Sequence, residues 1–122
     1  KYTVTLDTWA TSDSHVAANY SEKVHRALQC PTNNLFFVQQ NSLAKLHGLG
    51  FDIPEYMLEI DKHPWQKRQQ MILDILVNDT IDYDAEILYN RAMHNRNKFK
   101  HYSDLVDNGD FYSRIFDTVR QT

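Results

Sequence analysis

One arrangement of side chains in this sequence has a chemistry that is easy to name. Arg96 is directly followed by Asn97, and the run ends at His101. A guanidinium can hold a phosphate while negative charge develops on it, and a nearby imidazole can move a proton to or from a hydroxyl. A fixed cation and a nearby imidazole are groups that can assist the cleavage of a phosphodiester.

The pattern of Arg96, Asn97 and His101 resembles the motif of HEPN ribonucleases, small helical domains that dimerise and cut RNA without metal. The resemblance implies that Arg96 binds the scissile phosphate and that His101 transfers protons. On one helix, positions five apart lie about 140° around the axis, so the two side chains converge only at a helix start or across a dimer axis. Two alternatives are a solvated basic helix face and an anion or nucleic-acid contact without catalysis.

Acidic residues are concentrated in the middle of the chain. The net charge of −3 argues against a general nucleic-acid binder. Nine of the 16 acids lie between Asp52 and Glu86, and a basic run follows. We expect an acidic surface that binds a basic protein, including one that itself binds nucleic acid. The candidate binding residues are Asp52, Glu55, Glu59, Asp61, Asp82, Asp84 and Glu86.

Aromatic residues are the second indication of a binding surface. The chain has 7 Tyr, 6 Phe and 2 Trp, which is more large rings than one small core usually needs. Exposed rings beside acids are typical of a protein-contact patch. The alternative is that the tyrosine hydroxyls lie at the margin of the core.

The histidines do not form a recognised metal motif. His94 and His101 are seven positions apart and share one helical face if their helix is continuous. Zinc needs further ligands, and no known spacing connects the available ones, Cys30, His25 and His63. We expect no metal site and no cofactor.

The single cysteine and the hydropathy of the sequence indicate the cellular compartment of the protein. Cys30 has no partner for an internal disulfide, which fits a reducing compartment. No apolar run approaches the roughly 20 residues that cross a bilayer. We expect a cytoplasmic protein without a membrane span, and a homodimer is an open alternative.

Local patterns predict two strands and one helix in the N-terminal part. Tyr2–Ala10 alternates with a period of two, with Tyr2, Val4 and Leu6 on one face, which predicts a half-buried strand. A helix follows from Val16 until Pro31, and a short apolar run from Leu35 to Val38 predicts the second strand. The order strand, helix, strand favours a small βαβ-like unit.

The remainder of the chain predicts helices. They are expected over residues 43–47, from Pro54 to 60, over 65–77, from Asp82 as the cap, over 99–106 after an interruption at 95–97, and over 111–119. The segment Met71–Val77 is apolar at six of seven positions, which predicts a helix buried on nearly every side.

The predicted fold is one compact α+β domain over residues 1–122, and it is predominantly helical. Five or more helices surround a central buried helix, 65–77, with a small two- or three-stranded N-terminal β element. Because no complete catalytic constellation is visible, we expect a small regulatory or inhibitory protein that binds another macromolecule. The alternative is a metal-independent ribonuclease that uses Arg96 and His101.

Overall fold

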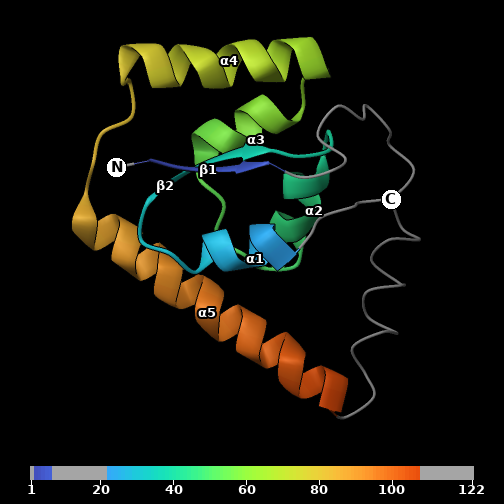
Figure 1. Cartoon of the computed structure of the whole chain (residues 1–122). Helices are drawn as coiled ribbons and strands as arrows, with labels where there is room; N and C mark the ends of the chain where they lie inside the picture. The colour runs from blue at the N-terminus through green and yellow to red at the C-terminus, as the bar shows by residue number, and fades with distance from the viewer. Residues whose placement is uncertain (1, 7–21, 108–122) are drawn as a thin grey trace.

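The order of helices and strands confirms the predicted fold class. The computed structural model describes residues 2–6 and 22–107 (Figure 1). They form β1 (Tyr2–Leu6), α1 (Glu22–Leu28), β2 (Asn33–Phe37), α2 (Ser42–Gly48), α3 (Glu55–Asp61), α4 (Trp65–Asn78) and α5 (Ala85–Asp107). The fold is therefore α+β and predominantly helical, with a short N-terminal sheet. The helix predicted at 111–119 lies outside the described residues.

The two strands pair in parallel, with Tyr2 opposite Asn33 and Leu6 opposite Phe37. Parallel neighbours need a crossover connection, and α1 lies in that connection and packs against both strands. The strand order thus matches the predicted βαβ-like unit. Burial alternates in β1 only from Val4 to Leu6, and there Thr5 is buried, whereas Val4 is 50% and Leu6 is 64% exposed. The prediction that Val4 and Leu6 lie on the buried face is therefore wrong.

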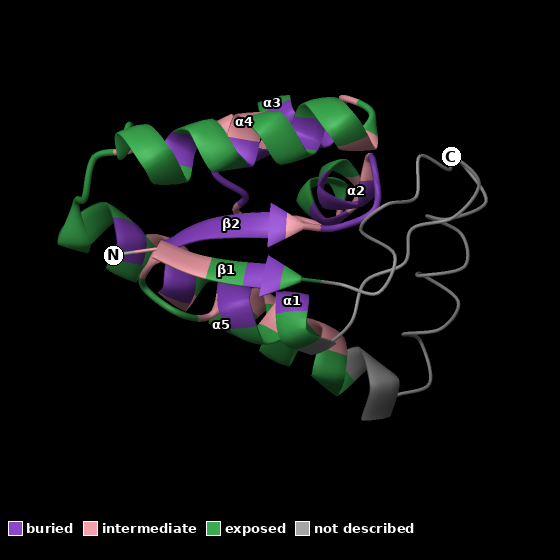
Figure 2. Cartoon of the chain, turned by 45° about the horizontal axis from the view of Figure 1, so that its top comes forward, coloured by how far each residue is buried: buried purple, intermediate pink, exposed green. Residues whose placement is uncertain are grey.

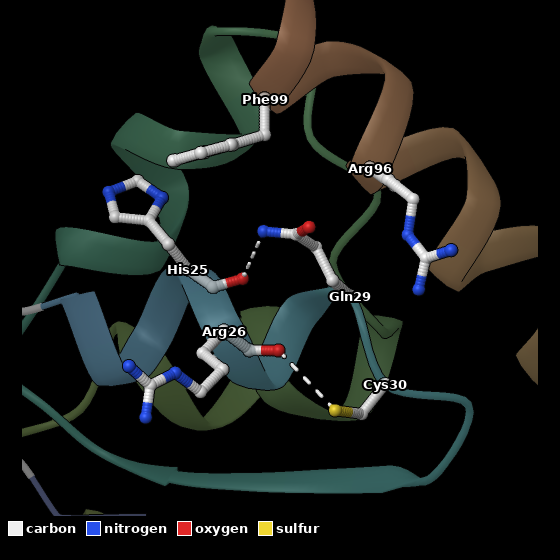
Figure 3. A pocket seen from close by; sticks show the side chains of 6 residues that line it. All are labelled: His25, Arg26, Gln29, Cys30, Arg96 and Phe99. Carbon is white, nitrogen blue, oxygen red and sulfur yellow. Dashed lines mark hydrogen bonds between the residues drawn. The ribbon is translucent and has the colours of Figure 1, made fainter. Parts of the chain in front are cut away.

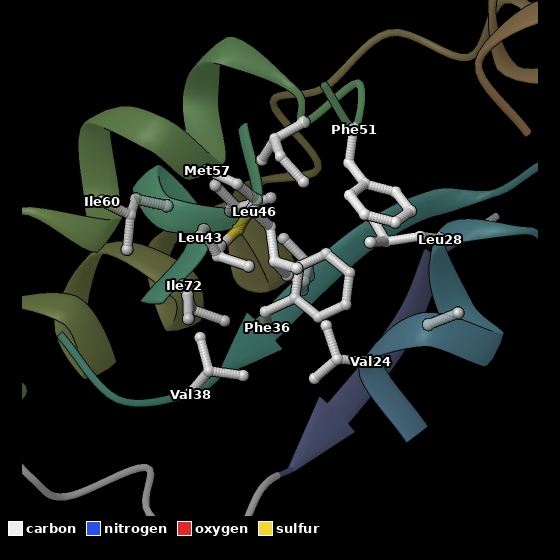
Figure 4. Packing of buried hydrophobic residues seen from close by; sticks show 14 residues of the cluster. Val24, Leu28, Phe36, Val38, Leu43, Leu46, Phe51, Met57, Ile60 and Ile72 are labelled. Atoms are coloured by element: carbon white, nitrogen blue, oxygen red, sulfur yellow. The ribbon is translucent and has the colours of Figure 1, made fainter. Parts of the chain in front are cut away.

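Helices cover both faces of the sheet. Figure 1 shows α3 and α4 on one side of the strands and α1 and α5 on the other, and Figure 2 shows the same layers from another angle. Leu35 and Phe36 point to opposite faces of β2, and both are buried. The buried cluster in Figure 4 includes Val24, Leu28, Leu35, Phe36, Val38, Leu43, Leu46, Met57, Ile60 and Ile72.

The prediction that helix 65–77 is the central buried element is wrong. Helix α4 spans the predicted residues, but it lies at the outside of the molecule (Figure 2). Only Arg68, Ile72 and Ile75 on this helix are buried, and Val77 is 80% exposed. The contacts of α4 are with α3 and β2, so it buries one stripe and leaves its other apolar side chains at the surface.

Helix α5 is one continuous helix of 23 residues, so the predicted interruption at 95–97 is also wrong. The carboxylate of Asp84 accepts hydrogen bonds from the N–H groups of Glu86 (3.1 Å) and Ile87 (3.2 Å). Asp84 is therefore the N-terminal cap, two residues after the predicted cap at Asp82.

Asn95 is fully buried in the middle of α5 and connects three parts of the chain. Its Oδ1 accepts a hydrogen bond from the N–H of Asp52 at 2.7 Å, and its Nδ2 donates to the carbonyl of the same residue at 3.0 Å. Nδ2 also donates to the carbonyl of Leu28 at 3.0 Å. One amide thereby satisfies backbone groups in the loop before α3 and at the end of α1.

Further side chains of α5 contact the same loop. Nε2 of His94 lies 2.7 Å from the carbonyl oxygen of Gly50, and the hydroxyl of Tyr102 donates to the carbonyl of Leu49 at 2.6 Å. Gly50 has a φ of 99°, and the stem of Lys98 lies where a Cβ at Gly50 would point. We refer to the contacts of His94, Asn95, Lys98 and Tyr102 with residues 49–52 as the α5–loop contact.

Replacing Asn95 by Ala should lower the free energy of unfolding by about 2–4 kcal/mol, because it leaves several buried backbone groups without a hydrogen bond. Urea denaturation measures this loss. The matched control is Asn97→Ala, because Asn97 is exposed on the same helix. Equal losses in the two variants would contradict the role of Asn95.

A second prediction concerns Gly50. Gly50→Ala should destabilise the fold by roughly 1–3 kcal/mol, because the positive φ strains an L residue and the new methyl group displaces Lys98. In Gly48→Ala the added Cβ meets no neighbouring atom, so this variant should unfold at nearly the wild-type urea concentration. If Gly50→Ala left the free energy of unfolding unchanged, Lys98 and the loop would not be held in fixed positions.

Candidate functional site

The structure does not bring Arg96 and His101 together within one chain. Both are exposed on the continuous helix α5, and their positions are about 140° apart around its axis. The imidazole of His101 lies against the ring of Tyr102, with ring centroids 5.5 Å apart. A single chain therefore does not supply the phosphate-binding and proton-transfer pair that the motif implies.

His94 and His101, which were considered as metal ligands, both lie on the continuous helix α5. His94 belongs to the α5–loop contact. Within residues 2–6 and 22–107, no three His, Cys, Asp or Glu side chains gather as metal ligands. In the same residues, no helix combines the length and the apolar character that crossing a bilayer needs.

The seven predicted acids do not share one surface. Asp52 lies 3.6 Å from Nε of Arg91, beside the loop before α3. Glu59 pairs with Lys62 at 2.7 Å, and this hydrogen bond lowers the pKa of Glu59. Glu55 is exposed at the start of α3. Asp52 thus pairs with a residue of α5, whereas Glu55 and Glu59 belong to α3.

Asp61 is buried, which removes it from any acidic surface. Its Oδ2 accepts a hydrogen bond from the N–H of Ala44 at 3.0 Å, so this side chain of α3 satisfies the start of α2. Asn41, the residue at the N-cap of α2, makes no capping hydrogen bond with its own side chain. Burial raises the pKa of Asp61 to about 6, although the backbone N–H groups of α2 and the charge of Arg68 oppose the rise.

The remaining acids lie in a segment rich in exposed apolar side chains. We call residues 73–89 the acidic edge. Its acids are Asp74, Asp79, Asp82, Asp84 and Glu86, and no Lys, Arg or His occurs within it. Its exposed large apolar residues are Leu73, Leu76, Val77, Tyr83, Ile87 and Tyr89.

The acidic edge runs from the end of α4 to the start of α5, at the end of the sheet where β1 begins (Figure 1). The hydroxyl of Tyr2 donates to Oδ1 of Asp79 at 2.7 Å and accepts from the N–H of Ile81 at 3.3 Å. The loop between the two helices is thereby attached to β1, which gives the edge a defined position.

A second feature is a hollow of about 450 Å³ between α1 and α5. It is lined by His25, Arg26, Gln29, Cys30, Arg96 and Phe99 (Figure 3). Sequence patterns predicted an anion contact near Arg96 as one alternative, but they missed the other five residues. No local signal could have found them, because α1 and α5 meet only through tertiary packing.

Comparisons with protein-family models, with curated proteins and with solved structures find no match for this chain. Its function must therefore be argued from its own residues.

The raised pKa of Asp61 predicts how stability depends on pH. The folded state holds the proton of Asp61 more tightly than the unfolded state, whose pKa is near 3.8. The contribution of Asp61 to the free energy of unfolding therefore falls as the pH rises from about 4 to about 6. The variant Asp61→Asn has no charge to bury, so its stability relative to wild type should increase over this range by up to about 3 kcal/mol.

Urea denaturation of both proteins across this range measures the difference, and the other carboxyl groups cancel in the comparison. Asn can still accept the hydrogen bond from Ala44, so the variant should fold. A difference that does not change with pH would show that Asp61 is ionised at little cost.

Proposed function

We propose that this chain is a non-catalytic binding protein that recognises a basic surface of another protein through the acidic edge. The observation that carries this proposal is the mixture of acids and large exposed apolar side chains over residues 73–89, without any cation among them. Small regulatory and inhibitory proteins act in this way, by occupying a surface that a partner uses for something else.

The exposed rings supply the contact area. Tyr83 and Tyr89 are each 57% exposed, and Ile87 between them is also exposed. Tyrosine is enriched at the centres of protein interfaces because it buries a large apolar ring and keeps a hydroxyl for hydrogen bonding. Exposing several large apolar side chains to water is unfavourable. Their occurrence in one segment therefore favours a bound state in which a partner covers them.

The acids supply selectivity for the partner. Asp82, Asp84 and Glu86 are exposed and alternate with Tyr83 and Ala85 in the sequence at the start of α5. Negative charge around an apolar contact speeds encounter with a basic surface and disfavours acidic ones. A basic protein, including one whose basic surface normally holds nucleic acid, fits this edge best.

The ribonuclease alternative requires a second chain. Arg96 and His101 point in different directions from one helix, so a catalytic pair would have to be completed across a dimer axis. The acidic edge needs no such assembly, which is why binding is the function that the geometry supports best.

The test is the binding of a short fluorescein-labelled peptide rich in Lys and Arg, followed by fluorescence anisotropy. Removing two charges in Asp82→Asn/Glu86→Gln should weaken binding about tenfold or more, which corresponds to about 1.4 kcal/mol. Wild-type binding should also weaken with salt, because the charges are exposed. Tyr83→Ser should weaken binding even at high salt.

The matched control is Glu55→Gln/Glu59→Gln, which removes the same number of exposed acids outside the acidic edge. If this control lost as much affinity for the peptide, the effect would depend only on net charge. That result would contradict the acidic edge as the binding surface. Cleavage of labelled RNA in the presence of a chelator, lost in His101→Ala, would contradict the non-catalytic assignment.

A further inference from the structure

The hollow between α1 and α5 combines two guanidinium groups with an exposed aromatic ring. In Figure 3 the amide of Gln29 lies in the middle, with Arg96 on one side of it and Arg26 on the other. Phe99 and His25 lie at a third side, with ring centroids 5.4 Å apart. The cations and the ring thus surround one common space.

The exposed cation Arg96 lines the hollow. Burial lowers the pKa of His25, so its imidazole is neutral at pH 7, and the charge that faces the hollow comes from the exposed guanidinium of Arg96. None of the described residues that line the hollow is acidic. A guanidinium binds phosphate oxygens with paired hydrogen bonds.

The ring adds a second kind of contact. Phe99 is 41% exposed, and its contact with His25 supports one part of the ring while another part remains open. Aromatic side chains beside basic groups stack on nucleobases, and this stacking tolerates any base. The volume of about 450 Å³ is within the range of small-ligand sites.

We propose that this hollow binds a nucleotide unit, with its phosphate at Arg96 and its base against Phe99. The unit can be a free nucleoside monophosphate or one nucleotide of a single-stranded RNA. The amide of Gln29 donates one hydrogen bond to the carbonyl of His25 at 3.2 Å, which leaves its oxygen facing the ligand space as an acceptor. This site is separate from the acidic edge and does not depend on it.

Cys30 provides a direct reporter of occupancy. It is the single cysteine of the chain, it is exposed, and it lines the hollow. Its thiol donates a weak hydrogen bond to the carbonyl of Arg26 at 3.4 Å. A ligand that fills the hollow should therefore cover the only thiol that a chromogenic disulfide reagent can modify.

The experiment measures the rate of Cys30 modification with adenosine monophosphate, with a short oligoadenylate and with inorganic phosphate. At a ligand concentration about tenfold above Kd, the rate should fall roughly tenfold, because only the unoccupied fraction reacts. Protection by the monophosphate supports a free nucleotide as the ligand, and protection by the oligomer alone supports a strand. Equal protection by inorganic phosphate, or no protection by any probe, would overturn the proposal.

Substitutions in the hollow test which residues are responsible for the protection of Cys30. Arg96→Gln and Phe99→Leu should each reduce the protection at least severalfold, because they remove one phosphate contact or the stacking surface. Lys67→Gln is the control, because it removes an exposed cation on α4, in the layer on the other side of the sheet. Protection should also persist in Asp82→Asn/Glu86→Gln. An equal loss in Lys67→Gln would contradict a localised site, and thermal unfolding of each variant checks the fold.

Discussion

The hydrogen bonds of Asn95 are the constraint on which the other features depend. A buried amide in the middle of a helix is costly unless its donors and acceptor are all used, and here they bind the backbone of Asp52 and Leu28. These bonds hold α5 against both the loop before α3 and the end of α1. The hollow exists because α1 and α5 are held at this separation, and Arg96, the next residue along the helix, is placed at its margin. The same attachment determines where the first turn of α5 presents its acids.

Helix α5 carries two surfaces of opposite character. Its first turn contains Glu86 and continues the acidic edge, and its later turns contain Arg96 and Phe99 beside the hollow. Ten residues of helix separate Glu86 from Arg96, which is about 15 Å along the axis. This distance exceeds the Debye length of about 8 Å at physiological salt, so the two surfaces act largely independently. A net charge of −3 can therefore conceal two surfaces of opposite charge.

Burial in this protein does not follow residue type in two informative places. Helix α4 is rich in apolar residues and yet lies in the outer layer, because only one of its faces meets α3 and β2. Asp61 is charged in water and yet buried, because the start of α2 needs a hydrogen-bond acceptor that Asn41 does not provide. In both cases the neighbouring elements decide the environment. The exposed apolar side of α4 then becomes part of the acidic edge.

The sequence by itself determined the class of the fold and the order of most helices and strands. Those depend on local properties, such as the breaks at Pro31 and Pro64 and the short apolar run of β2, which act over a few neighbouring residues. Only the tertiary structure decided which face of β1 is buried, that α4 is peripheral, and that α5 continues through Asn95. It also decided that Arg96 shares a hollow with His25. Each of these outcomes depends on partners many residues away, and periodicity along the chain carries no information about them.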